Sequence, residues 1–356
     1  MRRTAAFLLA TALAATPSLP AAQASSLPRV PGLSAEHDVS SRERGSSIGH
    51  STGTGVQLSS GPVVRMSRDS VLAQTLGSTV QLSSDLPVTG PFNDPTCVPT
   101  PEFPVPVILI HGTAGGSGHM VTLAEKLVAA GACTWALNYG ADQFSMLSAS
   151  AGRYGYADPF LSVHELGSFV DGVLRRTGAS QVDLVGHSQG GTLTKGYVMG
   201  LDGAGKVRRV VTLGATLHGT DVNGWNWVGS VVQAVPGSST FLAGEAAVQQ
   251  LWHSEFVDWL NGFPDAAPGV TYTALYTASD TIATPNETSM IDPGTSGADV
   301  VNVEVESACL HPVSHGGLVT DPVPIGLVVW GLTRAEGDSS PVCGRPESDP
   351  DHASGG

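Results

Sequence analysis

Residues 182–191 read Val-Asp-Leu-Val-Gly-His-Ser-Gln-Gly-Gly. The apolar start of this stretch favours a buried strand, and the residues after it favour a helix. A serine between a strand and a helix sits on a sharp turn, and the flanking glycines at 186 and 190 leave the space that such a turn needs. The hydroxyl of Ser188 then points out of the sheet, and we expect it to be a catalytic nucleophile. A glycine-rich turn without chemistry is the alternative, which the strand ahead of it disfavours.

Strands and helices alternate along the central part of the chain. Short apolar runs predict six strands, over residues 105–110, 134–139, 182–185, 207–213, 270–276 and 300–305. Helical spacing of apolar residues predicts four helices, over residues 123–130, 158–176, 190–199 and 322–333. This alternation implies an α/β fold, with a mostly parallel central sheet and helices on both faces. Sites in such sheets lie at the carboxyl ends of the strands.

A second candidate turn follows the first predicted strand, where residues 108–113 read Ile-Leu-Ile-His-Gly-Thr. The backbone N–H after Gly112 is free to face a cleft at the strand end. We therefore expect an oxyanion hole made by the backbone N–H groups of Thr113 and Gln189, and each such donor typically contributes about 10²–10³ in rate. Ala114 is the alternative to Thr113 if the turn is shifted, and a simple turn without this role also fits.

A serine hydroxyl is a poor nucleophile without a base, and the chain has 11 histidines. With this kind of serine turn the order along the chain is nucleophile, acid, base, which leaves His311 and His315. His315 lies in Ser-His-Gly-Gly, on a loop able to bend into the cleft, and is the expected base. His311, whose backbone Pro312 restricts, is the alternative. His111 and His187 stand beside the two turns, where we expect them to orient the backbone.

The acid should follow a late strand. Residues 272–280 read Tyr-Thr-Ala-Leu-Tyr-Thr-Ala-Ser-Asp, an apolar strand that leads to a carboxylate. Asp280 at this position would orient the imidazole of the base and stabilise its cationic form. Asp292 and Asp299 are the rivals, but both stand in a glycine- and proline-rich stretch without a preceding strand, where a turn role is simpler.

The N-terminus is typical of a targeting segment. Two arginines precede a short apolar run over residues 5–15, and Ala-Gln-Ala at 22–24 supplies a small-residue cleavage pattern. We expect a signal peptide over residues 1–24, a mature start at Ser25 and secretion to the extracellular space. Residues 25–94 are rich in Ser, Gly, Pro and Thr, so disorder or a pro-segment is expected there. The catalytic domain is expected over 95–335 and a polar tail over 336–356.

Four cysteines fit export, because an even number in an oxidising compartment is more often paired than free. Of the three possible connectivities we favour Cys97–Cys133 and Cys309–Cys343, since each pair flanks a segment that can return to its start. Metal binding is the alternative, but no Cys-x-x-Cys spacing occurs. The formal net charge of -14 argues against nucleic acid as a partner.

The motifs around Gly112, Ser188, Asp280 and His315 together resemble those of secreted bacterial lipases of the α/β-hydrolase superfamily. The resemblance is greatest to the actinobacterial triacylglycerol lipase group, which is related to the small Bacillus lipases, and covers about residues 95–335. It implies a Ser-His-Asp acyl-enzyme mechanism that hydrolyses carboxylic esters, including acylglycerols, without a metal or cofactor. The same family pattern puts the oxyanion donors at Thr113 and Gln189.

The expected partner is therefore a lipid or small ester, met by a monomer that makes transient contact with a lipid–water interface. A short-chain carboxylesterase and a polyester or cutin hydrolase are alternatives with the same triad. A non-catalytic secreted binding domain is the alternative from another class. Residues 219–241 are rich in large apolar side chains and could line an acyl pocket, form a small cap or belong to the core. Core positions are favoured for Leu251, Trp252, Phe256 and Trp259, which have helical spacing.

Overall fold

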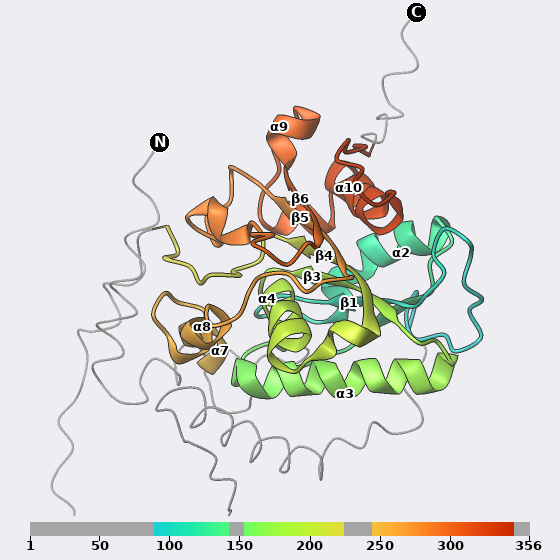
Figure 1. Cartoon of the computed structure of the whole chain (residues 1–356), viewed down its shortest axis with the longest axis horizontal. Coiled ribbons are helices and arrows are strands. Elements are labelled where there is room, and N and C mark those ends of the chain that lie inside the picture. Colours follow the sequence, from blue (N-terminus) through green and yellow to red (C-terminus); the bar gives the residue numbers. More distant parts are fainter. Residues whose placement is uncertain (1–88, 142–152, 224–243, 345–356) are drawn as a thin grey trace, which may run out of the picture. The chain divides into compact units, whose positions relative to one another are not determined.

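The computed structural model describes residues 89–141, 153–223 and 244–344 (Figure 1). The expected signal peptide and nearly all of the serine- and glycine-rich segment after it lie outside the described residues. So do residues 224–241 of the apolar segment. Within the described residues, no helix is both long and apolar enough to cross a membrane.

A six-stranded parallel sheet, in the order β2-β1-β3-β4-β5-β6, forms the centre of the fold. The strands are β1 (Val107–Ile110), β2 (Thr134–Ala136), β3 (Val182–His187), β4 (Val207–Leu213), β5 (Thr271–Tyr276) and β6 (Asp299–Glu304). All six predicted strands are present. Because β1 and β3 are neighbours, with Ile110 beside Gly186, the two predicted turns emerge side by side at one edge of the sheet.

Helices cover both faces of the sheet, as predicted (Figure 1). The α-helices are α2 (Val121–Ala129), α3 (Pro159–Thr177), α4 (Gln189–Lys195), α7 (Glu245–Gln249), α8 (Glu255–Leu260), α9 (Val305–Cys309) and α10 (Pro322–Thr333). Side chains of α3, α4 and α8 pack on one face of the sheet, and side chains of α2 and α10 pack on the other.

The all-apolar sequence of β1 follows from its central place. Its four side chains are fully buried, with Ile108 and Ile110 facing one layer of helices and Val107 and Leu109 facing the other. Successive side chains of a strand point to opposite faces, so a strand covered on both sides must be apolar throughout. This explains why the strand has no alternating pattern.

Two predicted elements are shorter than expected. The strand predicted over 134–139 ends at Ala136, because β2 is an edge strand and its partner β1 ends at Ile110. The helix predicted over 190–199 is α-helical only to Lys195 and continues as a π-turn over Gly196–Gly200. Helices α7, α8 and α9 have only five or six residues each. The helical spacing around Phe256 and Trp259 corresponds to α8, whereas no pattern in the sequence indicates α7 or α9.

The expectation for the four residues 251, 252, 256 and 259 is only partly confirmed. Phe256 and Trp259 belong to the core beside α3, whereas Trp252 is 37% exposed. Trp252 lies instead against Gly219, where a Cβ would be 2.9 Å from its ring. Packing on a glycine in a loop leaves the outer face of the indole in solvent.

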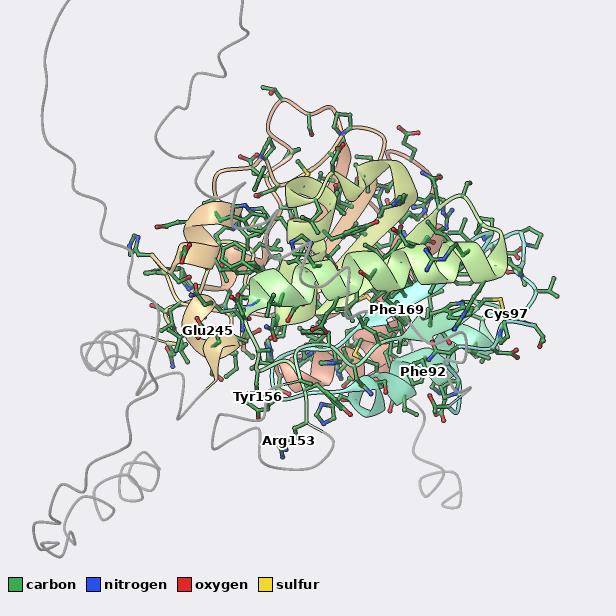
Figure 2. The ribbon with its side chains drawn as sticks, turned by 90° about the horizontal axis from the view of Figure 1, so that it is seen from below. Phe92, Cys97, Arg153, Tyr156, Phe169 and Glu245 are labelled. Atoms are coloured by element: carbon green, nitrogen blue, oxygen red, sulfur yellow. A yellow bond between two sulfur atoms is a disulfide. The ribbon has the colours of Figure 1, made fainter. Side chains whose placement is uncertain are left out.

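The packed part of the chain begins before the boundary expected at residue 95. Phe92 is 2% exposed, and the Asn93 amide exchanges hydrogen bonds of 3.0 and 3.2 Å with the backbone of Ala136 (Figure 2). The isolated apolar residue at 92 gave no periodic signal, so the sequence placed it in the polar segment. These contacts cover the free edge of β2.

Both cysteine pairs favoured from the sequence lie at bonding distance in the structure. Cys97 and Cys133 have Cα atoms 5.7 Å apart, and Cys309 and Cys343 have Cα atoms 5.8 Å apart. The first pair joins the N-terminal approach to the start of β2. The second joins the end of α9 to the C-terminal tail, whose Gly344 N–H also donates to the carbonyl of Val323 in α10.

Candidate active site

Ser188 stands at the turn between β3 and α4 with a left-handed backbone, φ 54° and ψ -126°. A residue other than glycine in this region carries strain of about 1–3 kcal/mol, which the surrounding structure must hold. The flanking glycines make this possible. A Cβ at Gly190 would lie 2.2 Å from the carbonyl oxygen of Ile110, and one at Gly186 would lie 2.5 Å from the nitrogen of Gly191. Only glycine fits at either place.

Asp280 and His315, which are far apart in the sequence, form a hydrogen-bonded pair. His315 Nδ1 is 2.7 Å from Asp280 Oδ2, and both side chains are largely buried. The other oxygen, Oδ1, accepts from the backbone N–H groups of Ile282 and Ala283 at 2.8 and 3.0 Å. The carboxylate is therefore held in one orientation, and because it accepts the Nδ1 proton, Nε2 of the neutral ring is the free acceptor.

The electrostatics of this pair favour an ionised Asp280. Burial on its own raises the pKa of the carboxyl, but the hydrogen bond and charge of His315 and the two backbone N–H groups outweigh it. The pKa of Asp280 consequently lies below its ordinary value. The negative charge is thus available to stabilise an imidazolium at His315.

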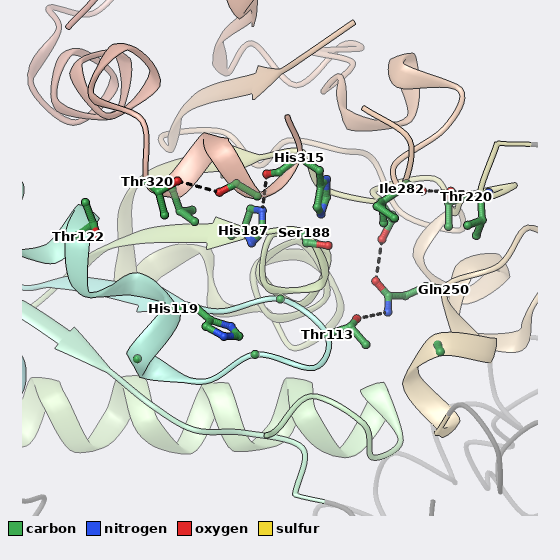
Figure 3. A pocket seen from close by; sticks show the side chains of 18 residues that line it. Thr113, His119, Thr122, His187, Ser188, Thr220, Gln250, Ile282, His315 and Thr320 are labelled. Atoms are coloured by element: carbon green, nitrogen blue, oxygen red, sulfur yellow. Dashed lines mark hydrogen bonds between the residues drawn. The ribbon is translucent and has the colours of Figure 1, made fainter. Parts of the chain in front are cut away.

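Ser188 and His315 line the same pocket, which has a volume of about 670 Å³ (Figure 3). Among the described residues, no hydrogen bond joins the Ser188 hydroxyl to His315. Catalytic hydrogen bonds are often long without substrate and shorten in the complex. Val222, Ile282 and Val319 supply apolar walls to the pocket.

The turn after β1 lies beside the serine turn. Thr113 lines the pocket, whereas the alternative donor Ala114 is not among the described residues that line it. In the described part of the chain, neither the Thr113 nor the Gln189 backbone N–H donates to a protein acceptor. Their side chains are joined, because Thr113 Oγ1 donates to Gln189 Oε1 at 3.1 Å. Two free N–H groups beside Ser188 suit a developing negative charge.

His111 lies beneath this turn and is fully buried. Its Nδ1 donates to the carbonyl of Gly112 at 2.8 Å, and its ring stacks on Tyr139 with centroids 4.3 Å apart. Burial lowers the pKa of His111 to about 4, so the ring is neutral at ordinary pH. The structure therefore gives His111 a backbone-orienting contact, as the sequence suggested.

The rival residues are engaged elsewhere. His311 Nε2 is 2.8 Å from Asp321 Oδ2, a carboxylate that caps the start of α10. Asp292 accepts the N–H of Gly294 at 2.9 Å within an exposed turn. Asp299 forms an ion pair with Arg334 at 2.9 Å. None of these three candidates is among the described residues that line the pocket.

Gln250 is a site residue that the sequence did not reveal. Its side-chain Nε2 donates to Thr113 Oγ1 at 2.9 Å, and its Oε1 accepts from Thr216 Oγ1 at 3.0 Å. It follows the short helix α7, in a stretch without a motif. No local signal could have found it, because its importance comes only from the contact with a turn far away in the sequence.

No group of three or more His, Cys, Asp or Glu side chains in the described residues is placed to hold a metal ion. The pocket is lined by the Ser188 hydroxyl, by the His315 imidazole that pairs with Asp280, and by Thr113, while Gln189 is buried next to Ser188 and does not line it. This set is suited to nucleophilic attack by the hydroxyl, with proton transfer to the ring and stabilisation of an oxyanion.

Comparison with known proteins agrees with this chemistry. The profile of the family described as Lipase (class 2) matches residues 104–312, more than half of the chain. Lipase B of Aspergillus fumigatus is similar at a TM-score of 0.50 and 21% identity, over 66% of this chain and 53% of that protein. This chain thus spans about half the length of that relative. The likeness shows the α/β-hydrolase fold.

Two further solved structures are similar at lower scores. Mature Bacillus licheniformis lipase BlEst2 has a TM-score of 0.42 and 15% identity, over 62% of this chain and 89% of that one. An esterase (EaEST) from Exiguobacterium antarcticum has a TM-score of 0.39 and 14% identity, over 60% of this chain and 86% of that one.

The glycine against the Asp280–His315 pair offers a test of this geometry. A Cβ on Gly214, whose φ is +55°, would lie 3.1 Å from both Asp280 Oδ2 and His315 Nδ1. We expect Gly214→Ala to lower turnover of a nitrophenyl ester by about 10²-fold, since displacing a catalytic group by about 1 Å costs about this much.

Gly294→Ala is the matched control for this variant. Gly294 also has a left-handed backbone, with φ +49°, but a Cβ there meets nothing within 4 Å. Strain from the backbone is then common to both variants, and only Gly214→Ala disturbs the pair. Wild-type turnover in a folded Gly214→Ala protein would contradict a role for the pair.

Proposed function

Because the chain belongs to the class 2 lipase family, we propose that it is a secreted serine ester hydrolase that acts on acylglycerols. Ser188 is the nucleophile, His315 the base and Asp280 the acid. The observation that carries the proposal is the 2.7 Å Asp280–His315 pair in the pocket that Ser188 enters from a strained turn.

In the first half of the reaction, Ser188 Oγ attacks the ester carbonyl carbon and its proton passes to His315 Nε2. The carbonyl oxygen becomes an oxyanion, which the N–H groups of Thr113 and Gln189 stabilise. The intermediate then collapses, the bond to the alkoxy oxygen breaks, and the His315 proton passes to the leaving alcohol. Asp280 keeps the ring oriented and its charge offsets the imidazolium.

In the second half, water replaces the alcohol. His315 Nε2 takes a proton from the water as its oxygen attacks the acyl carbon, and the same two N–H groups hold the second oxyanion. Collapse of this intermediate releases the carboxylic acid and returns the proton to Ser188 Oγ. The cycle needs no metal or cofactor.

The pocket supports an acyl-chain substrate. Its volume of about 670 Å³ is in the range of about 300–1,000 Å³ that is usual for small-molecule sites. Ile282, which lines the pocket, is 43% exposed, and Trp252 is 37% exposed. Both adjoin Thr220, whose hydroxyl donates to the Ile282 carbonyl and whose carbonyl accepts from Trp252 N–H. We assign this apolar rim to transient contact with a lipid–water interface.

Secretion is part of the same proposal. The basic, apolar and small-residue segments of residues 1–24 have the order of a signal peptide, and two cystine pairs suit an oxidising compartment. The mature monomer would begin at Ser25 and carry a polar segment ahead of the catalytic domain.

Substitution of two triad positions, Ser188 and His315, tests the mechanism. We expect Ser188→Ala to abolish labelling by a fluorophosphonate probe and to lower ester turnover by at least about 10⁴-fold, with the fold intact. His315→Ala should lose at least about 10³-fold, because nothing else accepts the serine proton. His311→Ala is the control and should retain turnover within about twofold. Label on Ser188→Ala, or a larger loss at 311 than at 315, would defeat the assignment.

A chain-length profile tests the substrate class. Each buried methylene contributes about 0.8 kcal/mol, so kcat/KM for nitrophenyl octanoate should exceed that for the acetate by at least about tenfold. Emulsified triacylglycerol should also be hydrolysed. A maximum at acetate with no activity on the emulsion would identify a short-chain carboxylesterase instead.

The pKa shifts predict a simple acid limb. Burial and neighbouring charge lower the pKa of His187 to about 3, and burial lowers the pKa of His111 to about 4. Despite burial, the pKa of Asp280 lies below its ordinary value because of its hydrogen bond to His315. Above about pH 5 these three groups keep their protonation state, so activity should fall on acidification through a single protonation. A plot of log kcat/KM against pH should have a limiting slope of one, and a slope of two would contradict this.

A further inference from the structure

His187 links two parts of the site that come from different segments of the chain. It precedes the nucleophile, yet its Nε2 is 3.0 Å from the carbonyl oxygen of His315 (Figure 3). The centroids of the two imidazole rings are 4.8 Å apart, and both residues line the pocket. The contact spans 128 positions in the sequence.

The direction of this hydrogen bond follows from the acceptor. A carbonyl oxygen only accepts, so the proton of the neutral His187 ring must be on Nε2. The ring is neutral because burial, and next the charge of His315, lower its pKa to about 3. Nδ1 is consequently unprotonated, and it faces Gly112, where a Cβ would lie 3.3 Å from it.

A loop carries the main chain of His315 into the site. The residue stands at the start of a 3₁₀ turn over Gly316–Val319 in a loop that follows α9, with Val313 held by a 2.7 Å hydrogen bond from Thr277 Oγ1. Asp280 restrains the imidazole but not the backbone that carries it. His187 Nε2 is a side-chain donor to the His315 carbonyl, and it comes from a distant segment of the chain.

We propose that His187 is a positioning residue, which fixes the backbone of His315 so that the imidazole stays within reach of Ser188. This inference rests on the proposed function of Ser188 and His315. The nucleophile turn and the base loop then share one hydrogen bond, and a shift of either turn moves both reacting groups together. His187 does not itself accept the serine proton, because its Nε2 already carries a proton and donates it to the carbonyl.

Two substitutions separate the hydrogen bond from the packing of the ring. His187→Phe keeps a flat ring of similar size but has no donor, whereas His187→Gln places an amide donor at a reach similar to Nε2. We expect His187→Phe to lower kcat by about 10²-fold with KM within about twofold, because the base is displaced and the pocket is not. His187→Gln should recover kcat to within about fivefold of wild type.

We would calculate kcat per active site, with the concentration of active sites measured by titration with a fluorophosphonate. Unfolded protein then does not alter kcat. His311→Phe is the matched control, because it removes a histidine that donates to Asp321 away from the pocket. It should leave kcat within about twofold of wild type. If His187→Phe does not fold, His187→Asn replaces it, since its shorter amide cannot reach the carbonyl, and the same loss against His187→Gln is expected.

A kcat equal to that of wild type in His187→Phe, or equal losses in the Phe and Gln variants, would overturn the positioning role. The proposed function would still stand in that case, provided that the wild-type protein is active. Wild-type protein with neither turnover nor label on Ser188 would instead overturn the proposed function, and with it the premise of this inference.

Discussion

The close approach of α4 to the end of β1 is the contact on which the site depends. A side chain at Gly190 would lie 2.2 Å from the carbonyl oxygen of Ile110 and 2.6 Å from that of His111. Because Gly190 has only a hydrogen atom at this position, the start of α4 can contact the end of β1. This close approach places the turn at Ser188 and Gln189 beside the turn at Thr113, and Ser188 has a positive φ there.

Around this contact, side-chain hydrogen bonds join segments that are distant in sequence. Gln250 donates to Thr113, which donates to Gln189, and His187 donates to the carbonyl of His315. The turn that carries Thr113 and the loop that carries His315 are thereby each attached to the turn around Ser188. These hydrogen bonds favour one relative placement of the segments. Any shift would leave a buried polar group without a partner, which costs free energy.

The charges near Ser188 are also limited by burial. His111 and His187 are kept neutral by low pKa values, so neither adds a positive charge beside the His315 ring. Further from the pocket, Lys195 of α4 forms a buried ion pair with Asp265 at 2.6 Å, and its Nζ also approaches the carbonyl of Leu217. The bond to Leu217 attaches the segment after β4, which contributes Thr216 to the pocket, to α4.

The sequence by itself determined the sheet, its helices and the best candidates for the triad. Apolar runs and helical spacing are local properties, and the glycines around Ser188 mark a turn that few other residues can form. Chain order then left His311 and His315, of which the loop around His315 fitted better, and the preceding strand favoured Asp280. Tertiary structure decided the end of β2, the inclusion of Phe92, and the partners Gln250 and His187. Each of these follows from contacts between distant segments, which packing sets and which leave no periodic trace in the chain.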